Sequence, residues 1–246
     1  TLLEKITIPD NIKKIGIGAF SNCTSLKEIT IPNSVKEIES FAFSCCTSLQ
    51  KINISDSITK MGIGAFSGCT SLKKITIPNG VKKIENSAFS HCTSLKEITI
   101  PNSVKEIECG AFSCCMSLKE VTIPDSVTEI EWATFCDCTS LQKINISDNV
   151  TKIGSSAFCG CTSLKEVIIP PKVKYIYKAT FLYKELSKIT FRGARTDISE
   201  SQIGYYKNND GLYIKNKNLV IEGYKGSTAE EYAQKNGFTF VPIDES

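Results

Sequence analysis

The chain has 246 residues, of which 41% are hydrophobic and 22% are charged, and its formal net charge is +3. The apolar content suffices for a continuous core, whereas the near-neutral charge gives no electrostatic reason to expect binding to nucleic acid or to an anionic membrane. No apolar stretch approaches the roughly 18 residues of a membrane-spanning helix.

A period of 23 residues runs through most of the chain. It starts at eight evenly spaced leucines, Leu3, Leu26, Leu49, Leu72, Leu95, Leu118, Leu141 and Leu164. A fixed short period is the signature of a solenoid, in which each repeat buries its apolar face only against its neighbours. The chain opens inside a repeat, and solenoid ends need a polar cap. We therefore expect it to be a fragment of a longer protein.

Each repeat, numbered from its leucine, predicts two short extended segments and a compact turn. Positions 4 and 6 are β-branched, as in Ile29 and Ile31, and this alternation favours a strand. Proline at position 7 ends the strand because it has no N–H to donate, and Asp or Asn then suits a turn. A second extended segment carries residues such as Val35 and Ile38, and the turn carries Ala at position 17 and Phe at position 18.

The phenylalanines of position 18 form one column. It contains Phe20, Phe43, Phe66, Phe89, Phe112, Phe135, Phe158 and Phe181. Neighbouring parallel strands lie about 4.8 Å apart, so the rings are expected to stack along the axis as a buried spine.

The C-terminal part of the chain departs from the period. Residues 192–218 match no repeat, and we expect a polar loop from Arg195 to Asn218 with one short strand near Leu212–Ile214. Residues 219–224 and 238–243 are strand-like. Between them, Ser227 or Thr228 can cap a short helix with Glu230 or Glu231, and Gly237 suits the position after its end.

The pattern LxxIxI…VxxI…AFxxC resembles the BspA-like (Bacteroides surface protein A-like) class of leucine-rich repeats over about residues 3–185, and residues 219–243 resemble the closing segment of such arrays. The resemblance implies a repeat solenoid, mainly β, with parallel short strands and a small α/β C-terminal cap. We expect two parts: residues 1–185 as the solenoid of eight repeats, and residues 186–246 as a final degenerate repeat, loop and cap.

Seven of the 12 cysteines occupy position 21 and are expected to form a buried ladder of free thiols. Adjacent Cα atoms there are within disulfide range, but parallel Cβ vectors do not meet the dihedral requirement of the bond. The other five, Cys45, Cys109, Cys114, Cys136 and Cys159, are predicted to be exposed.

Cys136 and Cys159 lie in adjacent repeats and leave two alternatives open. With Cys138 and Cys161 they form two C-x-C pairs, which would make a four-thiolate zinc site, although the usual zinc spacing is C-x-x-C. A surface disulfide between them is the other alternative. The preferred interpretation is drift at a small-residue position, so no metal or cofactor is expected.

Catalytic patterns are not convincing in this sequence. His91, the only histidine, is next to Cys92 and could in principle activate it, but adjacent residues here should point in different directions. The sequence has no G-x-S-x-G, no phosphate-binding glycine loop and no H-E-x-x-H. We therefore predict that the chain is not an enzyme.

Two surfaces compete as the binding site. The first is the flat polar sheet face at positions 3 and 5. The second lies toward the C-terminus and carries Trp132, Tyr175, Tyr177, Lys178 and Tyr183, since exposed aromatic residues are typical binding hot spots. Alternatively, Trp132 covers its own turn and the tyrosines pack against the cap.

The resemblance implies a non-catalytic interaction module in the ectodomain of a surface or secreted adhesin. Its partners would be proteins or glycoproteins of host matrix, host cells or other microbes, with no nucleic acid and no membrane insertion, and the module would be a monomer at the cell surface or outside the cell. A structural spacer or stalk, or a targeting region of a larger protein, remains the alternative.

Overall fold

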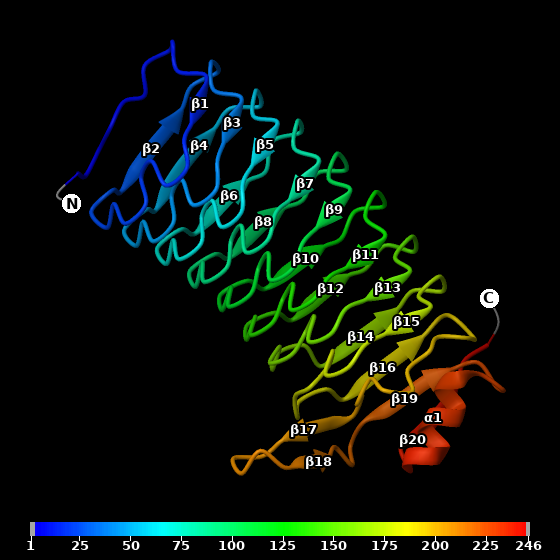
Figure 1. The fold of residues 1–246 in the computed structure, drawn as a ribbon. Coiled ribbons are helices and arrows are strands. Elements are labelled where there is room, and N and C mark those ends of the chain that lie inside the picture. Colours follow the sequence, from blue (N-terminus) through cyan, green and yellow to red (C-terminus); the bar gives the residue numbers. More distant parts are fainter. Residues whose placement is uncertain (1–2, 245–246) are drawn as a thin grey trace.

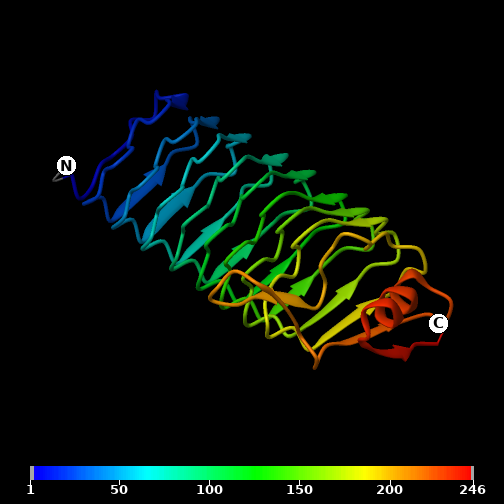
Figure 2. The same cartoon turned by 60° about the horizontal axis from the view of Figure 1, so that its bottom comes forward.

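The computed structural model describes residues 3–244, so the two outermost positions at each end of the predicted solenoid and cap lie outside the described residues. The chain winds into an elongated solenoid whose turns follow one another from the N-terminus to a cap at the C-terminal end (Figure 1). Two series of short strands run along opposite sides of each turn, and the view of Figure 2 shows the turns in succession. The predicted mainly β repeat solenoid is confirmed.

The first strand series contains the predicted positions 4 and 6. Its members are β2 (Glu28–Ile31), β4 (Lys51–Ile54), β6 (Lys74–Thr76), β8 (Glu97–Thr99), β10 (Glu120–Thr122), β12 (Lys143–Asn145), β14 (Glu166–Ile169) and β16 (Lys188–Phe191). They pair in parallel wherever the structure forms a ladder, for example Glu28 with Lys51 between β2 and β4. The alternation exposed–buried along β2 and β14 follows from the period of two.

The second series consists of very short strands. They are β1 (Lys14–Ile15), β3 (Glu37–Ile38), β5 (Lys60–Met61), β7 (Lys83–Ile84), β9 (Glu106–Ile107), β11 (Glu129–Ile130), β13 (Lys152–Ile153) and β15 (Tyr175–Ile176). Where they form ladders, each pairs with the equivalent strand of the next turn, as Lys14 does with Glu37. The predicted second extended segment is thereby confirmed.

The core is a continuous column between the two strand series. In the repeat from Leu72 every predicted apolar position is buried: Leu72, Ile75, Ile77, Val81, Ile84, Ala88, Phe89 and Cys92. The compact turn that closes each repeat uses left-handed backbone at positions 16 and 20, where Gly64 and Gly68 have φ values of 56° and 74°. Glycine adopts this region without a steric cost.

The phenylalanine spine forms as predicted. Consecutive rings are stacked with centroids 5.1–5.6 Å apart from Phe20 to Phe181. All are fully buried except Phe20, which is partly buried in the first turn. Burying a phenylalanine side chain contributes roughly 2–3 kcal/mol, so the spine is a principal source of stability.

The cysteine ladder has a hydrogen-bonding function as well as a packing one. Each thiol from the second repeat onward donates to the carbonyl oxygen of the phenylalanine in the turn before. The pairs are Cys46–Phe20, Cys69–Phe43, Cys92–Phe66, Cys115–Phe89, Cys138–Phe112 and Cys161–Phe135, at 3.1–3.3 Å. These carbonyls belong to the tight turn, where a buried acceptor without a partner would be costly. Cysteine is small enough for the site and still supplies a donor.

The C-terminal part is more ordered than the sequence predicts. Residues 192–203 continue the solenoid for another partial turn, because Asp197 bridges to Tyr175 in parallel and Ile198 and Ile203 are buried. The expected polar loop with one strand is instead an antiparallel hairpin of β17 (Tyr205–Lys207) and β18 (Tyr213–Lys215). The additional strand, Tyr205–Lys207, has no alternating apolar pattern that would have revealed it.

The cap closes the array with a strand, a helix and a strand. β19 (Val220–Gly223) pairs with β16, and β20 (Thr239–Pro242) pairs with β19, both in parallel. Helix α1 (Thr228–Asn236) connects them and begins at Ser227, whose side chain accepts a hydrogen bond from the Glu230 amide. It ends at Gly237, whose φ is 65°, as the sequence predicts.

The spine makes a stability prediction. Phe112→Ala should lower the free energy of unfolding by roughly 3–5 kcal/mol, because the buried ring leaves a cavity between two stacked neighbours. Urea unfolding followed by circular dichroism measures this. Phe41→Ala is the matched control, since Phe41 is exposed and should change stability little. Equal effects of the two changes would contradict the spine assignment.

The ladder predicts a division of the thiols by reactivity. Burial raises the pKa of Cys46, Cys92 and Cys138 to about 12, so these thiols are protonated as well as inaccessible at neutral pH. A chromogenic disulfide reagent in native buffer near neutral pH should label the exposed Cys45 promptly. The ladder thiols should react only after denaturant is added, and rapid native labelling of Cys92 would refute the buried ladder.

Candidate functional site

The flat sheet face presents two polar columns. Position 3 alternates between lysine and glutamate on several neighbouring turns, giving ion pairs such as Lys74–Glu97 at 2.8 Å and Lys143–Glu120 at 3.0 Å. Position 5 carries threonine or asparagine as far as Asn145, which donates to the Thr122 hydroxyl at 3.2 Å, and the exposed Ile168 in the next turn. The polar side chains satisfy one another, and exposed ion pairs contribute little free energy. The face therefore offers a partner few unpaired groups and no aromatic anchor.

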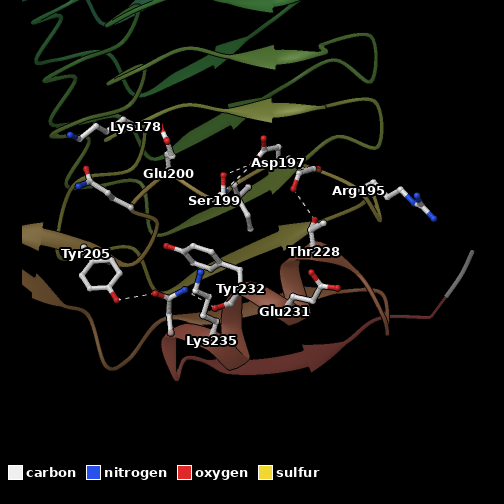
Figure 3. Close-up of a pocket in the computed structure, with 14 residues that line it drawn as sticks. Lys178, Arg195, Asp197, Ser199, Glu200, Tyr205, Thr228, Glu231, Tyr232 and Lys235 are labelled. Carbon is white, nitrogen blue, oxygen red and sulfur yellow. Dashed lines mark hydrogen bonds between the residues drawn. The ribbon is translucent and has the colours of Figure 1, made fainter.

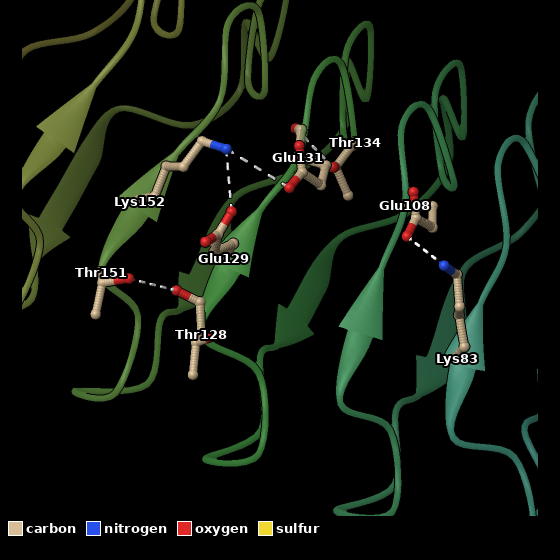
Figure 4. Close-up of polar contacts among 8 residues, drawn as sticks. All are labelled: Lys83, Glu108, Thr128, Glu129, Glu131, Thr134, Thr151 and Lys152. Atoms are coloured by element: carbon tan, nitrogen blue, oxygen red, sulfur yellow. Dashed lines mark hydrogen bonds and ion pairs between the residues drawn. The ribbon is translucent and has the colours of Figure 1, made fainter.

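The opposite edge, which carries positions 12 to 16, has forked ion pairs (Figure 4). The Lys152 ammonium lies 3.0 Å from Glu129 and 3.7 Å from Glu131. Its hydrogen bond with Glu129 raises the pKa of Lys152, and burial raises the pKa of Glu131. Lys83 makes the same fork with Glu106 and Glu108, at 3.0 and 2.6 Å.

Trp132 projects from this edge, with 57% of its surface exposed. Its backbone is fixed by the next turn, because a Cβ at Gly154 would lie 2.8 Å from the Trp132 amide nitrogen and 2.7 Å from the Glu131 carbonyl carbon. Only glycine permits this close approach. Trp132 is exposed, as the sequence predicts, and its role in binding stays a prediction.

Two tyrosines lie two turns further on. Tyr175 and Tyr177 are exposed, and their ring centroids are 6.3 Å apart. The Lys152 ammonium, which pairs with Glu129 and Glu131, also lies 5.7 Å from the centroid of the Tyr177 ring. This cation–π contact connects the ion pairs with the exposed tyrosines. We call Trp132, Tyr175, Tyr177 and Lys178 the C-terminal aromatic edge.

Two hollows adjoin this edge. One, of about 780 Å³, lies between the last solenoid turn and α1 and is lined by Lys178, Glu200 and Lys235 among others (Figure 3). We call it the cap hollow. The other, of about 830 Å³, is lined by Tyr175 and Lys172 and shares Arg195 and Asp197 with the first. The aromatic edge thus continues into concave surface of both charge signs.

Hydrogen bonds between the cap and the last turn hold the cap hollow in shape. The Thr228 hydroxyl donates to the Thr196 carbonyl at 2.7 Å, and the Tyr232 hydroxyl donates to the Ile203 carbonyl at 2.9 Å. The Ser199 amide and hydroxyl donate to the Asp197 carboxylate, which lowers its pKa and keeps it ionised. In Figure 3 side chains from the turn and from α1 line the same space.

Tyr183 does not belong to this surface, contrary to the sequence prediction. It is only 4% exposed, and its hydroxyl donates to the Leu164 carbonyl at 2.8 Å. Burial raises its pKa well above the usual value. The turn that contains Tyr183 is one residue shorter than the others. Glu166 pairs with Lys188, whereas the regular period would pair it with Ile189. In this shortened turn the Tyr183 side chain points inward and lies near Cys161.

The sequence patterns did not reveal a second exposed apolar group, near the N-terminus. Ile17, Phe41 and Ile63 lie on three consecutive turns of the same edge, and Ile17 and Phe41 are 72% and 47% exposed. Phe41 adopts a left-handed backbone with φ of 58°, and its ring occupies the space that a Cβ at Gly64 would need. The available signal was a phenylalanine at position 16, where other repeats carry Gly, Ser or Ala. We call this group the N-terminal apolar patch.

The catalytic and zinc alternatives gain no support from the geometry. His91 is exposed, whereas the Cys92 thiol is buried and donates to the Phe66 carbonyl. Cys138 and Cys161 likewise donate inward, away from the half-exposed Cys136 and Cys159. Over residues 3–244 no three His, Cys, Asp or Glu side chains gather as a metal site would require.

Comparisons with known proteins agree with this architecture. The model of the BspA type leucine-rich repeat region matches residues 1–108 and 82–210, with six copies. A leucine-rich repeat protein from T. pallidum is 32% identical in sequence, covering 65% of this chain and 77% of that one, with a TM-score of 0.61. The pneumococcal vaccine antigen PcpA has a TM-score of 0.60 at 17% identity, covering 89% of this chain and 68% of that one. This second likeness shows the fold alone.

A comparison with curated protein sequences found no match. In the described part of the chain, no helix has the length and apolar character that a membrane crossing requires. Leucine-rich repeat solenoids are in general non-enzymatic scaffolds for protein interaction. With a period, spine and cap of this kind, and a family match that covers most of its length, the chain belongs to the BspA-type leucine-rich repeat family.

Proposed function

We propose that the chain is a non-catalytic interaction module of a surface or secreted adhesin, acting as a monomer on a protein or glycoprotein of host matrix, host cells or other microbes. The observation that carries the proposal is the C-terminal aromatic edge together with the two hollows beside it. A rigid array supports such a role because its backbone is ordered before binding, so little conformational entropy is lost.

The chemistry of the edge fits a polar partner with an apolar anchor. Trp132 and the two tyrosines supply large apolar contacts at a low entropy cost, and aromatic residues and arginine are enriched among binding hot spots. Arg195 and Asp197 provide both charge signs in the shared wall of the hollows.

A spacer is the second candidate, and the regularity of the array favours it. Neighbouring turns repeat the same ladder of strands, rings and thiols, so adding turns lengthens the array without new contacts. A spacer needs no aromatic anchor, however, and would gain nothing from an exposed tryptophan.

Binding measurements distinguish the two. The labelled chain is applied to a panel of matrix proteins and to cultured host cells, with Trp132→Ala alongside. We expect saturable binding that Trp132→Ala weakens by roughly 2 kcal/mol, which is about thirtyfold in Kd. Saturable binding that is insensitive to Trp132, Tyr175 and Tyr177 would refute the aromatic edge as the site, and no saturable binding would favour the spacer.

Ile17→Ala is the matched control, since it truncates an exposed apolar residue at the same position of the first repeat. It should leave binding unchanged if the C-terminal aromatic edge is the site. A loss of binding with Ile17→Ala alone would transfer the site to the N-terminal apolar patch.

A further inference from the structure

Cys136 and Cys159 occupy the same position in two consecutive turns. The backbone around them is in register, since the Asp137 amide donates to the Cys159 carbonyl at 2.7 Å. The preceding residues, Phe135 and Phe158, stack with ring centroids 5.6 Å apart. Equivalent Cα atoms of adjacent turns are about 4.8 Å apart, which lies within the span of a disulfide. The ladder thiols are held parallel by burial and by their hydrogen bonds to carbonyls, whereas Cys136 and Cys159 are half-exposed, so their side chains can rotate into the dihedral that a disulfide requires.

The two thiols differ from those of the buried ladder. Both are half-exposed, and the Cys136 thiol lies within hydrogen-bonding reach of the Cys159 sulfur. The Cys159 thiol also has a longer contact with a backbone acceptor of the following turn, the Leu182 carbonyl at 3.9 Å. The carboxylate of Asp137 is a second acceptor for the Cys136 proton, at 3.5 Å. Position 19 holds Ser113 before the pair and Leu182 after it, so the pair is isolated in its column.

Their surroundings divide the roles of the two sulfurs. The hydrogen bond from Cys136 lowers the pKa of Cys159, with a further contribution from the Lys207 ammonium, against the opposing effects of burial and Asp137. The same hydrogen bond, burial and Asp137 raise the pKa of Cys136. Cys159 is therefore the sulfur that ionises first, and the thiolate is the nucleophile.

Cys159 also lies on the wall of a hollow of about 710 Å³, which the β17–β18 hairpin closes from one side. The charged groups that line it are Asp137, Lys184, Glu185, Lys207 and Asp210. The hollow is wide open to solvent, so a small disulfide can reach the Cys159 sulfur. The hairpin was not foreseen from the repeat pattern, so only the folded chain places Lys207 near this thiol.

We propose that Cys159 and Cys136 form a thiol–disulfide exchange site for low-molecular-weight disulfides, independent of the proposed interaction surface. The Cys159 thiolate attacks one sulfur of the small disulfide and releases one thiolate, leaving a mixed disulfide on Cys159. The Cys136 thiol then loses its proton to solvent and attacks the Cys159 sulfur, releasing the second thiolate. The protein pair is oxidised by two electrons, and the small disulfide is reduced to two thiols.

The test uses the full chain, reduced and then treated with 2-hydroxyethyl disulfide at neutral pH without denaturant. Peptide mass spectrometry follows each cysteine with time. We expect a Cys136–Cys159 disulfide as the main product, formed several-fold faster than the adduct on Cys45, which is exposed but has no facing thiol. Cys136→Ser should retain a lasting adduct on Cys159, because the resolving thiol is gone.

Two variants test the assignment of roles. Lys207→Gln should slow the reaction of Cys159 several-fold and leave that of Cys45 unchanged, since only Cys159 has this ammonium nearby. Cys159→Ser should slow adduct formation at Cys136. The proposal is overturned if Cys159 reacts no faster than Cys45 in the unmodified chain, if Cys136 reacts first, or if the Cys159 adduct persists while Cys136 is present. The site-resolved rates of the unmodified chain decide this even if a variant fails to fold.

Discussion

In-register stacking of successive turns is the constraint on which every other feature depends. Parallel pairing joins equivalent positions of successive turns in both strand series, as with Ile75 and Ile98 in one and Ile84 and Ile107 in the other. Each side chain therefore meets its own equivalent in the turns above and below. Side chains that tolerate a like neighbour, or that alternate with a complementary one, are the ones that fit.

The columns show how each residue type meets this condition. Phenylalanine rings stack on their equivalents, and ladder thiols donate to the carbonyl of the turn before. Lysine and glutamate alternate where like charges would otherwise face each other, as at Lys74 and Glu97. The apolar columns supply most of the stability, whereas the exposed ion pairs chiefly exclude other registers.

Binding and reactivity are expected where a residue departs from its column. Tyr175 and Tyr177 replace glycine or charged residues, and Trp132 is the one aromatic residue in its column, and all three side chains are exposed. Cys136 and Cys159 are both half-exposed, and their sulfurs lie within hydrogen-bonding reach of each other. Because the repeats are nearly identical, a residue that differs from its equivalents in the remaining turns is easy to recognise.

The sequence by itself determined the period, the strands, the phenylalanine spine, the buried thiols and the capped helix, because each depends on local pattern or on repetition at a fixed spacing. The exposure of Trp132 also followed from its position in the repeat. The tertiary structure alone decided what happens where the spacing changes. A turn shorter than the others takes Tyr183 into the core, and a hairpin without an apolar pattern places Lys207 beside Cys159. Both results depend on contacts between segments whose separation no longer follows the period, so position within the repeat could not predict them.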